Sequence, residues 1–297
     1  MLLGLKAFES IWLRLIQISK KALEYLAGRF FEIQLKPLTF KEFLKMKGLE
    51  IKEEEIELYQ RKALPLFLDY LRKAGFPEIV EWEKDEEIKE YVKNSVVARV
   101  VLRDISMEFG IKDFELIESM LKLIFSNPGL IFNFNLISKS FKKSRMTISN
   151  YLNYLKYGLA VKILSNYRKS ILATSRKFKK VYPATTSFTF AYSNLFYEKE
   201  FFGKVLETYV INALNANFYF RKNNKEIDAI LEKNKKLLPI EVKESMKEKD
   251  IEKFLKTLKE LNLEEGIIVT LEEFNEKIVK NKKIRILPAW YLDFFEF

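Results

Sequence analysis

Hydrophobic and polar positions over residues 203–243 change their period, and the change predicts one helix followed by three strands. Apolar residues recur at helical spacing over 203–214. An aromatic strand is predicted at 218–220, followed by an Asn-Asn turn. Two further strands are predicted at 226–231 and 237–243. The spacing therefore favours a compact α/β unit in the C-terminal third of the chain.

Neighbouring side chains of a strand point to opposite faces, so the charged positions of these strands can be assigned to faces. Glu226, Asp228 and Ile230 are expected on one face of the second strand. In the third strand, Glu241 and Lys243 are expected to point the same way. A carboxylate and an amine two residues apart, with a carboxylate on the preceding strand, can converge on one point.

Such a convergence suits metal-assisted cleavage of a phosphodiester. Mg²⁺ prefers oxygen ligands and binds through a few carboxylates together with substrate phosphate. Asp228 and Glu241 are expected to hold the ion, which lowers the pKa of a bound water and stabilises the charged transition state. Lys243 would orient that water or neutralise the phosphate. Glu207, in the preceding helix, would complete the metal's ligand set or recruit a second ion. All four are predicted catalytic residues.

The order of Glu207, Asp228 and the triplet 241–243 (Glu-Val-Lys) resembles the PD-(D/E)XK nuclease superfamily, which has the restriction-endonuclease-like fold. The order and short spacing are similar to those of archaeal Holliday junction resolvases. Ile227 stands where the superfamily motif has a proline. The resemblance implies a Mg²⁺-dependent nuclease. Two alternatives are an ordinary βαβ domain with solvated charges at a strand edge and a nuclease fold that has lost its activity.

Composition narrows the chemistry. The 297 residues suffice for two or three domains, and 48% are hydrophobic, enough for a core. The chain has no cysteine and no histidine, which excludes disulfides, thiolate zinc sites and histidine-based catalysis. Any metal site must be built from carboxylates. The apolar runs are too short to span a membrane, and charged residues interrupt the N-terminal apolar stretch, so a cytoplasmic protein is expected.

The formal net charge of +11 is concentrated in one block of the chain. Residues 119–197 contain thirteen Lys or Arg and no Asp or Glu. A basic block of this kind is the electrostatic footprint of a nucleic-acid-binding protein, so DNA is the expected partner. The alternatives are a generic basic surface and a surface that contacts an acidic protein.

The spacing of residues 111–182 predicts a winged helix inside this basic block. Helices are expected at 112–126, 132–141 and 146–158, and wing strands at 161–163 and 179–182. In helix-turn-helix proteins, the second helix of the motif enters the major groove by its N-terminal residues. The expected groove residues are Ser144, Arg145, Thr147, Ser149 and Asn150. The expected phosphate contacts are Lys142, Lys143, Arg168, Lys169, Arg176 and Lys177. The alternative is a winged helix used only for packing or protein contacts.

The flanking regions are predicted from the same kinds of pattern. An amphipathic helix is expected over 1–27, a short strand over 31–35, and a capping box in which Thr39 and Glu42 begin a helix, with three or four more helices up to about residue 109. Beyond residue 243, the pattern predicts helix 247–261, strand 266–270, helix 271–280 and strand 284–287. The aromatic tail from residue 289 is expected to dock on its own domain.

Four short motifs occur in order along the first 110 residues: LAGR at 26–29, PLTFKEFL at 37–44, GFPE at 75–78 and RDI at 103–105. Together they resemble the second half of prokaryotic AAA+-type ATPases common in archaea. In that family, a P-loop module is followed by a helical region, a winged helix and a nuclease-like C-terminal domain. The resemblance implies a helical region over 1–110, a winged-helix DNA-binding domain over 111–182 and a PD-(D/E)XK nuclease-like domain over 183–297.

The chain departs from that family in its nucleotide site. Its nine glycines include no pair spaced for a G-x-x-x-x-G-K-[ST] loop, so ATP hydrolysis by this chain alone is not expected. The family's phosphate-binding residues would lie upstream of Met1. A truncated gene and a family member without the motor both fit this departure, and the poor match of the first 27 residues favours degeneration.

The sequence therefore predicts an α+β multidomain protein with a helical N-terminal region, a winged helix-turn-helix and a C-terminal α/β restriction-endonuclease-like domain. The expected function is DNA binding coupled to Mg²⁺-dependent cleavage. The alternative is a catalytically inactive ATPase-family remnant that serves as a DNA- or protein-binding module. A protein partner or a second copy of the chain is also compatible with the sequence.

Overall fold

The computed structural model describes residues 37–49, 60–168, 170, 174, 178–223, 225–233 and 236–295. The predicted helix over 1–27 and strand over 31–35 lie outside the described residues. So do three of the predicted phosphate contacts, Lys169, Arg176 and Lys177.

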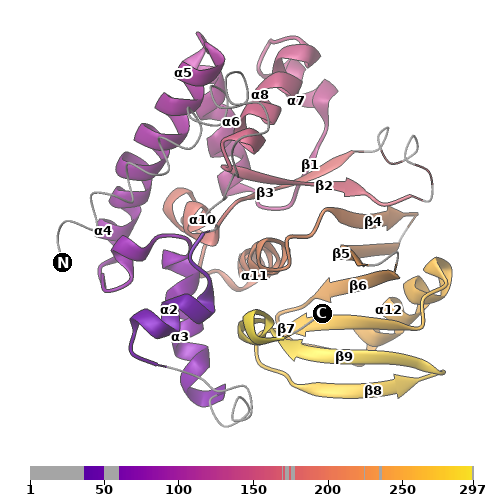
Figure 1. Cartoon of the computed structure of the whole chain (residues 1–297). Coiled ribbons are helices and arrows are strands. Elements are labelled where there is room, and N and C mark those ends of the chain that lie inside the picture. The colour runs from indigo at the N-terminus through magenta and orange to yellow at the C-terminus, as the bar shows by residue number, and fades with distance from the viewer. Residues whose placement is uncertain are drawn as a thin grey trace, which may run out of the picture.

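The first described part of the chain is helical, as predicted. It comprises α2 (Phe40–Met46), α3 (Gln60–Lys73), the 3-10 turn η2 (Pro77–Ile79), α4 (Asp85–Glu90), the π-helical η3 (Tyr91–Asp104) and α5 (Ile105–Phe109). The last three follow one another directly as a long ribbon (Figure 1). The predicted capping box is confirmed: Thr39 Oγ1 accepts the Glu42 N–H at 3.2 Å, and the Glu42 carboxylate accepts the Thr39 N–H at 2.8 Å.

The segment 111–182, predicted as a winged helix, contains α6 (Phe114–Ser126), β1 (Leu130–Phe132), α7 (Phe134–Ser140), α8 (Arg145–Tyr157), β2 (Val161–Asn166) and β3 (Lys179–Pro183). The second predicted helix begins later than expected, because 130–132 instead pairs with β3 as strand β1. Asn133 starts α7, since its side chain accepts the N–H groups of Asn135 and Leu136. Strands are present at both positions predicted for the wing, as the antiparallel pair β2 and β3, while their role as a wing stays a prediction.

The remaining described elements are α10 (Thr186–Tyr192), α11 (Lys199–Ala213), β4 (Phe218–Lys222), β5 (Lys225–Lys233), β6 (Lys236–Val242), α12 (Glu248–Leu261), β7 (Glu265–Thr270), β8 (Asn275–Val279), β9 (Lys282–Pro288) and η4 (Ala289–Phe294). The predicted helix at 271–280 is wrong. Residues 275–279 form β8, which pairs antiparallel with β9. Lys280 and Asn281 both have positive φ, of 52° and 60°, which is the backbone that a two-residue hairpin requires.

All nine described strands form one mixed sheet in the order β1-β3-β2-β4-β5-β6-β7-β9-β8. Parallel pairing occurs between β2 and β4, β6 and β7, and β7 and β9, and the other neighbours are antiparallel. The fold is therefore α+β, as predicted at this level. None of the described helices has the length and apolar character that a membrane span requires.

The pairing of β2 with β4 carries the sheet across the expected domain boundary at residue 182. Ser165 pairs with Phe218 and Asn166 with Tyr219. The buried Asn166 amide continues the ladder, because its Nδ2 donates to the Arg221 carbonyl at 3.0 Å and its Oδ1 accepts the Arg221 N–H at 3.1 Å. This junction sets β3, from the basic block, near the C-terminal strands.

Two hydrophobic clusters hold the layers together. The larger runs from the N-terminal helices to α11 and one face of the sheet, and the Phe67 and Tyr209 rings lie 4.8 Å apart within it. The smaller fills the space between the sheet and α12. Gly266 permits this close approach, since a Cβ there would lie 2.6 Å from the Phe254 ring. The aromatic tail over 289–295 packs on α11 and β9 of its own predicted domain, where Trp290 is buried, and also on α2 and α3 of the predicted N-terminal region, where Asp293 Oδ2 accepts the Phe40 N–H at 2.7 Å.

Candidate functional site

The four predicted catalytic residues lie close together in the structure. Glu207 belongs to α11, Asp228 to β5 and Glu241 to β6, and Lys243 follows β6 directly. Pairing of Ala229 with Ile240 sets Asp228 beside the end of β6. Asp228 Oδ2 accepts the N–H of the residue after Glu241 at 2.9 Å, and Lys243 Nζ donates to Glu241 Oε1 at 2.5 Å. The predicted convergence of Glu241 and Lys243 is confirmed, while the catalytic roles stay predictions.

One detail of the predicted strand pattern is wrong. In the pairing of β4 with β5, Phe218 lies opposite Ile230 and Phe220 opposite Ile227. Two residue steps along β4 therefore correspond to three along β5, so β5 has a β-bulge between Ile227 and Ile230. Ile227 and Ile230 consequently both pack in the cluster against α12. The side chains of β5 therefore do not alternate strictly between the two faces of the sheet. Ile230 does not lie on the same face as Asp228, contrary to the prediction.

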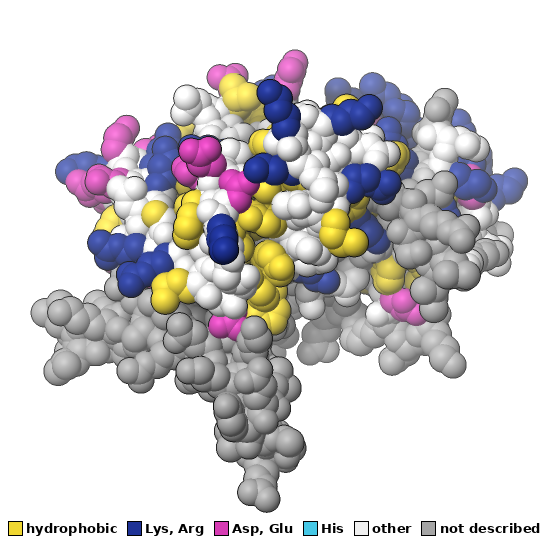
Figure 2. Space-filling view, turned by 90° about the horizontal axis from the view of Figure 1, so that it is seen from above, with side chains coloured by type: hydrophobic (Ala, Val, Ile, Leu, Met, Phe, Trp, Pro, Cys, Tyr) yellow, Lys and Arg dark blue, Asp and Glu magenta, His cyan; other side chains and the backbone are white. Residues whose placement is uncertain are grey.

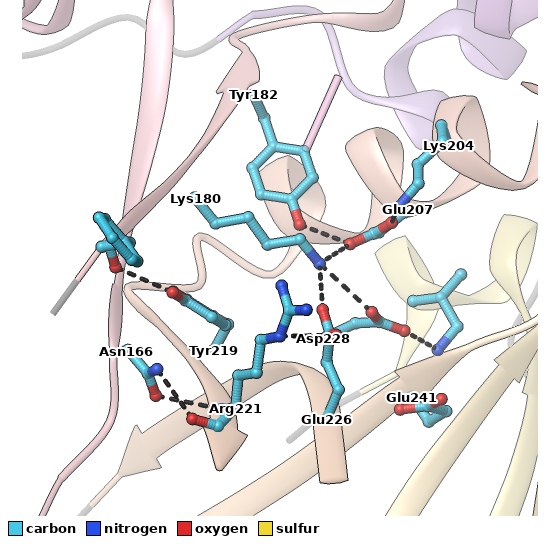
Figure 3. A network of polar contacts seen from close by, with 12 residues as sticks. Asn166, Lys180, Tyr182, Lys204, Glu207, Tyr219, Arg221, Glu226, Asp228 and Glu241 are labelled. Atoms are coloured by element: carbon cyan, nitrogen blue, oxygen red, sulfur yellow. Dashed lines mark hydrogen bonds and ion pairs between the residues drawn. The ribbon is translucent and has the colours of Figure 1, made fainter. Parts of the chain in front are cut away.

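Glu207 is buried and fully engaged by neighbouring donors. Its Oε1 accepts hydrogen bonds from Lys180 Nζ at 2.6 Å and from the Tyr182 hydroxyl at 2.5 Å, and its Oε2 accepts one from Lys204 Nζ at 2.9 Å (Figure 3). Burial opposes ionisation of Glu207, but the charges of Lys180 and Lys204 outweigh burial and lower its pKa to about 2. Glu207 is thus a stable carboxylate in the folded protein.

Lys180, on β3, is the central cation of the site and was not predicted to belong to it. Its side chain is 2% exposed, and its Nζ lies 2.6 Å from Glu207, 3.2 Å from Glu226 and 3.5 Å from Asp228 (Figure 3). Burial disfavours its charge, yet Glu207 and the other nearby carboxylates raise its pKa well above the usual lysine value. Lys180 and Tyr182 are two residues apart on one strand, and side chains at this spacing point to the same face. This rule could have predicted from the sequence that the two side chains lie together, but not that they contact Glu207.

Asp228 and Glu241 form a poorly compensated pair of carboxylates. Glu241 Oε2 is buried and has no hydrogen-bond partner among the described residues. Burial and the charge of Asp228 raise the pKa of Glu241 to about 8, against the opposing effect of Lys243. Burial and the charge of Glu207 likewise raise the pKa of Asp228. The pair is therefore the part of the cluster with capacity for a further positive charge.

Asp228 and Glu241 are the candidate ligands for a metal ion at this site. Within the described residues, no group of three or more acidic side chains is arranged to hold one. Asp228 and Glu241 nevertheless supply two adjacent carboxylates and one unsatisfied buried oxygen, which suits Mg²⁺ bound through two carboxylates, water and substrate phosphate. The oxygens of Glu207 are already occupied by three donors. The fit is to Asp228 and Glu241, and the metal-binding role predicted for Glu207 stays a prediction.

The site opens at a rim and lies apart from two cavities elsewhere in the described part of the chain. Those cavities have volumes of about 640 and 360 Å³, and none of the four predicted catalytic residues lines either. The side chains of Glu226 and Lys243 are 40% and 31% exposed and mark the rim. An open rim suits an extended polymer better than an enclosed small molecule.

The predicted DNA-binding residues at the start of α8 lie on the surface. Lys142, Lys143, Ser144 and Arg145, here called the basic turn, are exposed, as is Asn150, whereas Thr147 and Ser149 are half-buried. Ser144 caps α8, because its Oγ accepts the Thr147 N–H at 3.0 Å. Lys143 Nζ lies 2.6 Å from Asp113. Figure 2 shows Lys and Arg spread widely over the face seen from above, with acidic side chains among them.

Arg168 behaves differently from the basic turn. Its guanidinium donates to Asn166 Oδ1 at 2.8 Å and to the carbonyls of Tyr167 and Arg221, and it packs over the Phe220 ring. Its hydrogen-bonding groups are thus engaged by β2 and β4. The side chains of the basic turn are exposed to solvent, whereas the Arg168 guanidinium is held by the neighbouring backbone and side chains.

Comparison with known proteins finds two family models and uncharacterised relatives. Residues 64–199 match a domain of unknown function (DUF8612), and residues 202–292 match a domain of unknown function (DUF4143) that occurs in AAA-ATPase-associated families. The chain is 30% identical over 295 residues to the uncharacterized protein MJ1544 of Methanocaldococcus jannaschii, covering 92% of this chain. It is 32% identical over 136 residues to an uncharacterized protein of Haemophilus influenzae, covering 44% of this chain.

The chain spans 65% and 32% of the lengths of these two relatives. No solved structure matches it. Lys180 lies in the first matched segment, whereas Glu207, Asp228 and Glu241 lie in the second. The site therefore combines residues from both matched segments.

Proposed function

We propose that this protein binds DNA and cleaves phosphodiesters with Mg²⁺ at the site of Asp228, Glu241 and Lys243. The observation that carries the proposal is the convergence of these residues with Glu207, which brings together the middle of β5, the end of β6 and helix α11. The helix and three strands predicted from the hydrophobic pattern are present as α11, β4, β5 and β6. The unsatisfied Oε2 of Glu241 supplies the independent indication that a cation belongs there.

Each side chain has a distinct part in this proposal. Asp228 and Glu241 would hold Mg²⁺, which when bound lowers the pKa of a water and stabilises developing charge on the phosphate. Lys243 reaches the rim, and its ammonium touches Glu241, so it is positioned to contact a phosphate oxygen. The Val242 N–H holds the Asp228 carboxylate in place. Glu207 accepts hydrogen bonds from Lys180 and Tyr182 and so holds these two side chains next to the proposed metal ligands.

DNA binding is assigned to the basic turn and the start of α8. The predicted helices and wing strands are present as α6, α7, α8, β2 and β3, which supports a winged helix. The exposed Arg145 and Asn150 lie on α8, where they can reach base edges. Lys142 and Lys143 precede that helix, where they can contact phosphates.

The test is a cleavage assay on single-stranded, duplex and branched DNA with Mg²⁺ or Mn²⁺. Asp228→Asn should abolish cleavage and weaken the metal-induced rise in melting temperature, because it removes a charged ligand at nearly constant volume. Lys243→Ala should abolish cleavage but keep the thermal response to metal. Glu232→Gln, at an exposed position of the same strand as Asp228, is the matched control and should retain both.

A second candidate is a catalytically inactive binding module derived from an ATPase-family protein. It is favoured by one observation, the insertion of Lys180 among the carboxylates, which supplies a cation without a metal. If the wild-type protein cleaves none of the three DNA forms and metals leave its melting temperature unchanged, this second candidate replaces the nuclease.

A further inference from the structure

The ammonium group of Lys180 occupies the space that separates Glu207 from Asp228. It is buried, and two of its three carboxylate partners, Glu207 and Asp228, are themselves shielded, with side chains 5% and 14% exposed. The rings of Tyr182 and Tyr219 flank it, with centroids 5.7 and 5.9 Å from Nζ. A lysine enclosed in this way cannot swing out to solvent without breaking its ion pairs with Glu207 and Asp228, so its charge is a fixed part of the site.

Cations of the protein already lie beside the carboxylates of the site, although Glu241 Oε2 has no hydrogen-bond partner among the described residues. The carboxylates within it are Glu207, Glu226, Asp228 and Glu241. The cations paired with them are Lys180, Lys204, Arg221 and Lys243. A divalent ion that enters must therefore compete with a cation already in place, instead of filling a net negative cavity.

Lys180 acts on the ion in two ways. It occupies Glu207 Oε1, which removes that oxygen from the set of available metal ligands. It also holds a positive charge 3.5 Å from Asp228 Oδ1, and like charges in a buried site repel strongly. Both effects oppose binding of a divalent ion beside Asp228.

We propose that Lys180 is a built-in cation that restricts the site to the two ligands Asp228 and Glu241 and keeps its affinity for divalent ions low. This inference rests on the proposed metal site. Metal occupancy then depends on substrate phosphate to supply further oxygen ligands, so the ion and the DNA bind together. Because Lys180 comes from β3, the segment that carries the predicted wing sets the metal affinity of the C-terminal site.

The experiment measures Mn²⁺ binding without DNA, by electron paramagnetic resonance of the free ion and by calorimetry. Lys180→Met alone would leave the buried Glu207 carboxylate without its main partner and would lower stability. The experiment therefore compares two variants in which Glu207 is replaced by the neutral Gln. Glu207→Gln keeps Lys180, and the double variant Lys180→Met, Glu207→Gln lacks it. Since both lack the Glu207 carboxylate, they differ only in the ammonium.

The double variant should bind Mn²⁺ at least about tenfold more tightly than Glu207→Gln, which corresponds to about 1.4 kcal/mol. Lys179→Met is the control, because Lys179 is the neighbouring residue on β3 and its Nζ donates to the Ser165 hydroxyl at 3.0 Å, outside the carboxylate site. It should bind Mn²⁺ as the wild type does.

Two results would overturn the inference, and they differ from each other. Equal Mn²⁺ affinity in Glu207→Gln and the double variant, with binding still lost in Asp228→Asn, rejects the role of Lys180 and leaves the proposed metal site standing. No Mn²⁺ binding by the wild type or either variant rejects the metal site and the role of Lys180 together.

Discussion

The carboxylate site and the basic turn are both rich in charge, but the charges are held in opposite environments. Lys180 is 2% exposed and touches three carboxylates, whereas Lys143 is 42% exposed and pairs with Asp113 at the surface. Removing one partner of a buried ion pair leaves an uncompensated charge, while an exposed pair exchanges its partner for water. The same residue type therefore stabilises the fold in one place and remains available to a ligand in the other.

The largest expected effect comes from breaking the buried pair. Lys180→Ala should lower the free energy of unfolding by about 3–5 kcal/mol, because it leaves Glu207 charged and buried. Urea denaturation at pH 7 measures the change. Lys204→Ala, which removes the more exposed partner of the same carboxylate, should cost about 1 kcal/mol or less. Equal losses in the two variants would mean that burial does not set the strength of these pairs.

The pH dependence of protein stability tests whether Asp228 and Glu241 form a poorly compensated pair of carboxylates. Glu241 has a folded pKa of about 8, above the value of about 4.3 for an unfolded glutamate. The folded state therefore keeps a proton that the unfolded state releases, and stability should fall as pH rises from about 4 to 8. Glu241→Gln should flatten this decline, whose upper bound is about 5 kcal/mol because about 3.7 pKa units separate the two states and each is worth about 1.4 kcal/mol.

Urea midpoints at several pH values, in the presence of a chelator, measure that decline. Glu232→Gln, at an exposed position of β5, should leave it intact. Parallel pH curves for the wild type and Glu241→Gln would show that the Glu241 carboxyl is not destabilised by its surroundings.

The basic turn is tested by the salt dependence of DNA binding and not by protein stability. Replacing Lys142, Lys143 and Arg145 with Ala should weaken binding to all DNA sequences and reduce the slope of log affinity against log salt by roughly 2–3, since each phosphate contact releases about 0.9 counterion. The control replaces three exposed lysines of α12, at positions 249, 253 and 256, with Ala. If both triple variants lose affinity equally, net charge and not the basic turn governs binding.

The smallest expected effect completes the comparison. Lys143→Ala should leave the urea midpoint unchanged within error, although it removes the contact with Asp113, because both side chains remain accessible to water. The melting temperature without DNA is an independent readout. A clear loss of stability would place Lys143 in the folded framework and weaken its assignment as a phosphate contact.

The sequence by itself determined most elements and the membership of the four-residue site. Helical spacing gave α11, and short apolar segments with alternating charges gave β5 and β6, because local periodicity fixes which side of an element is buried. The Thr39 capping box was equally local. The helix predicted at 271–280 failed because pairing with β9 outweighed a weak helical pattern, and pairing partners are not visible in a local window.

Only the tertiary structure decided the role of Lys180. In the sequence it is one of thirteen basic residues in an acid-free block and was counted toward a DNA-binding surface. The parallel pairing of β2 with β4 joins β3 to the sheet that carries β5, so the Lys180 side chain reaches Asp228 of β5 and becomes the buried partner of Glu207 of α11. Burial and charge pairing depend on contacts between residues far apart in the chain. Composition could count this positive charge, but only the fold could show which carboxylates it faces.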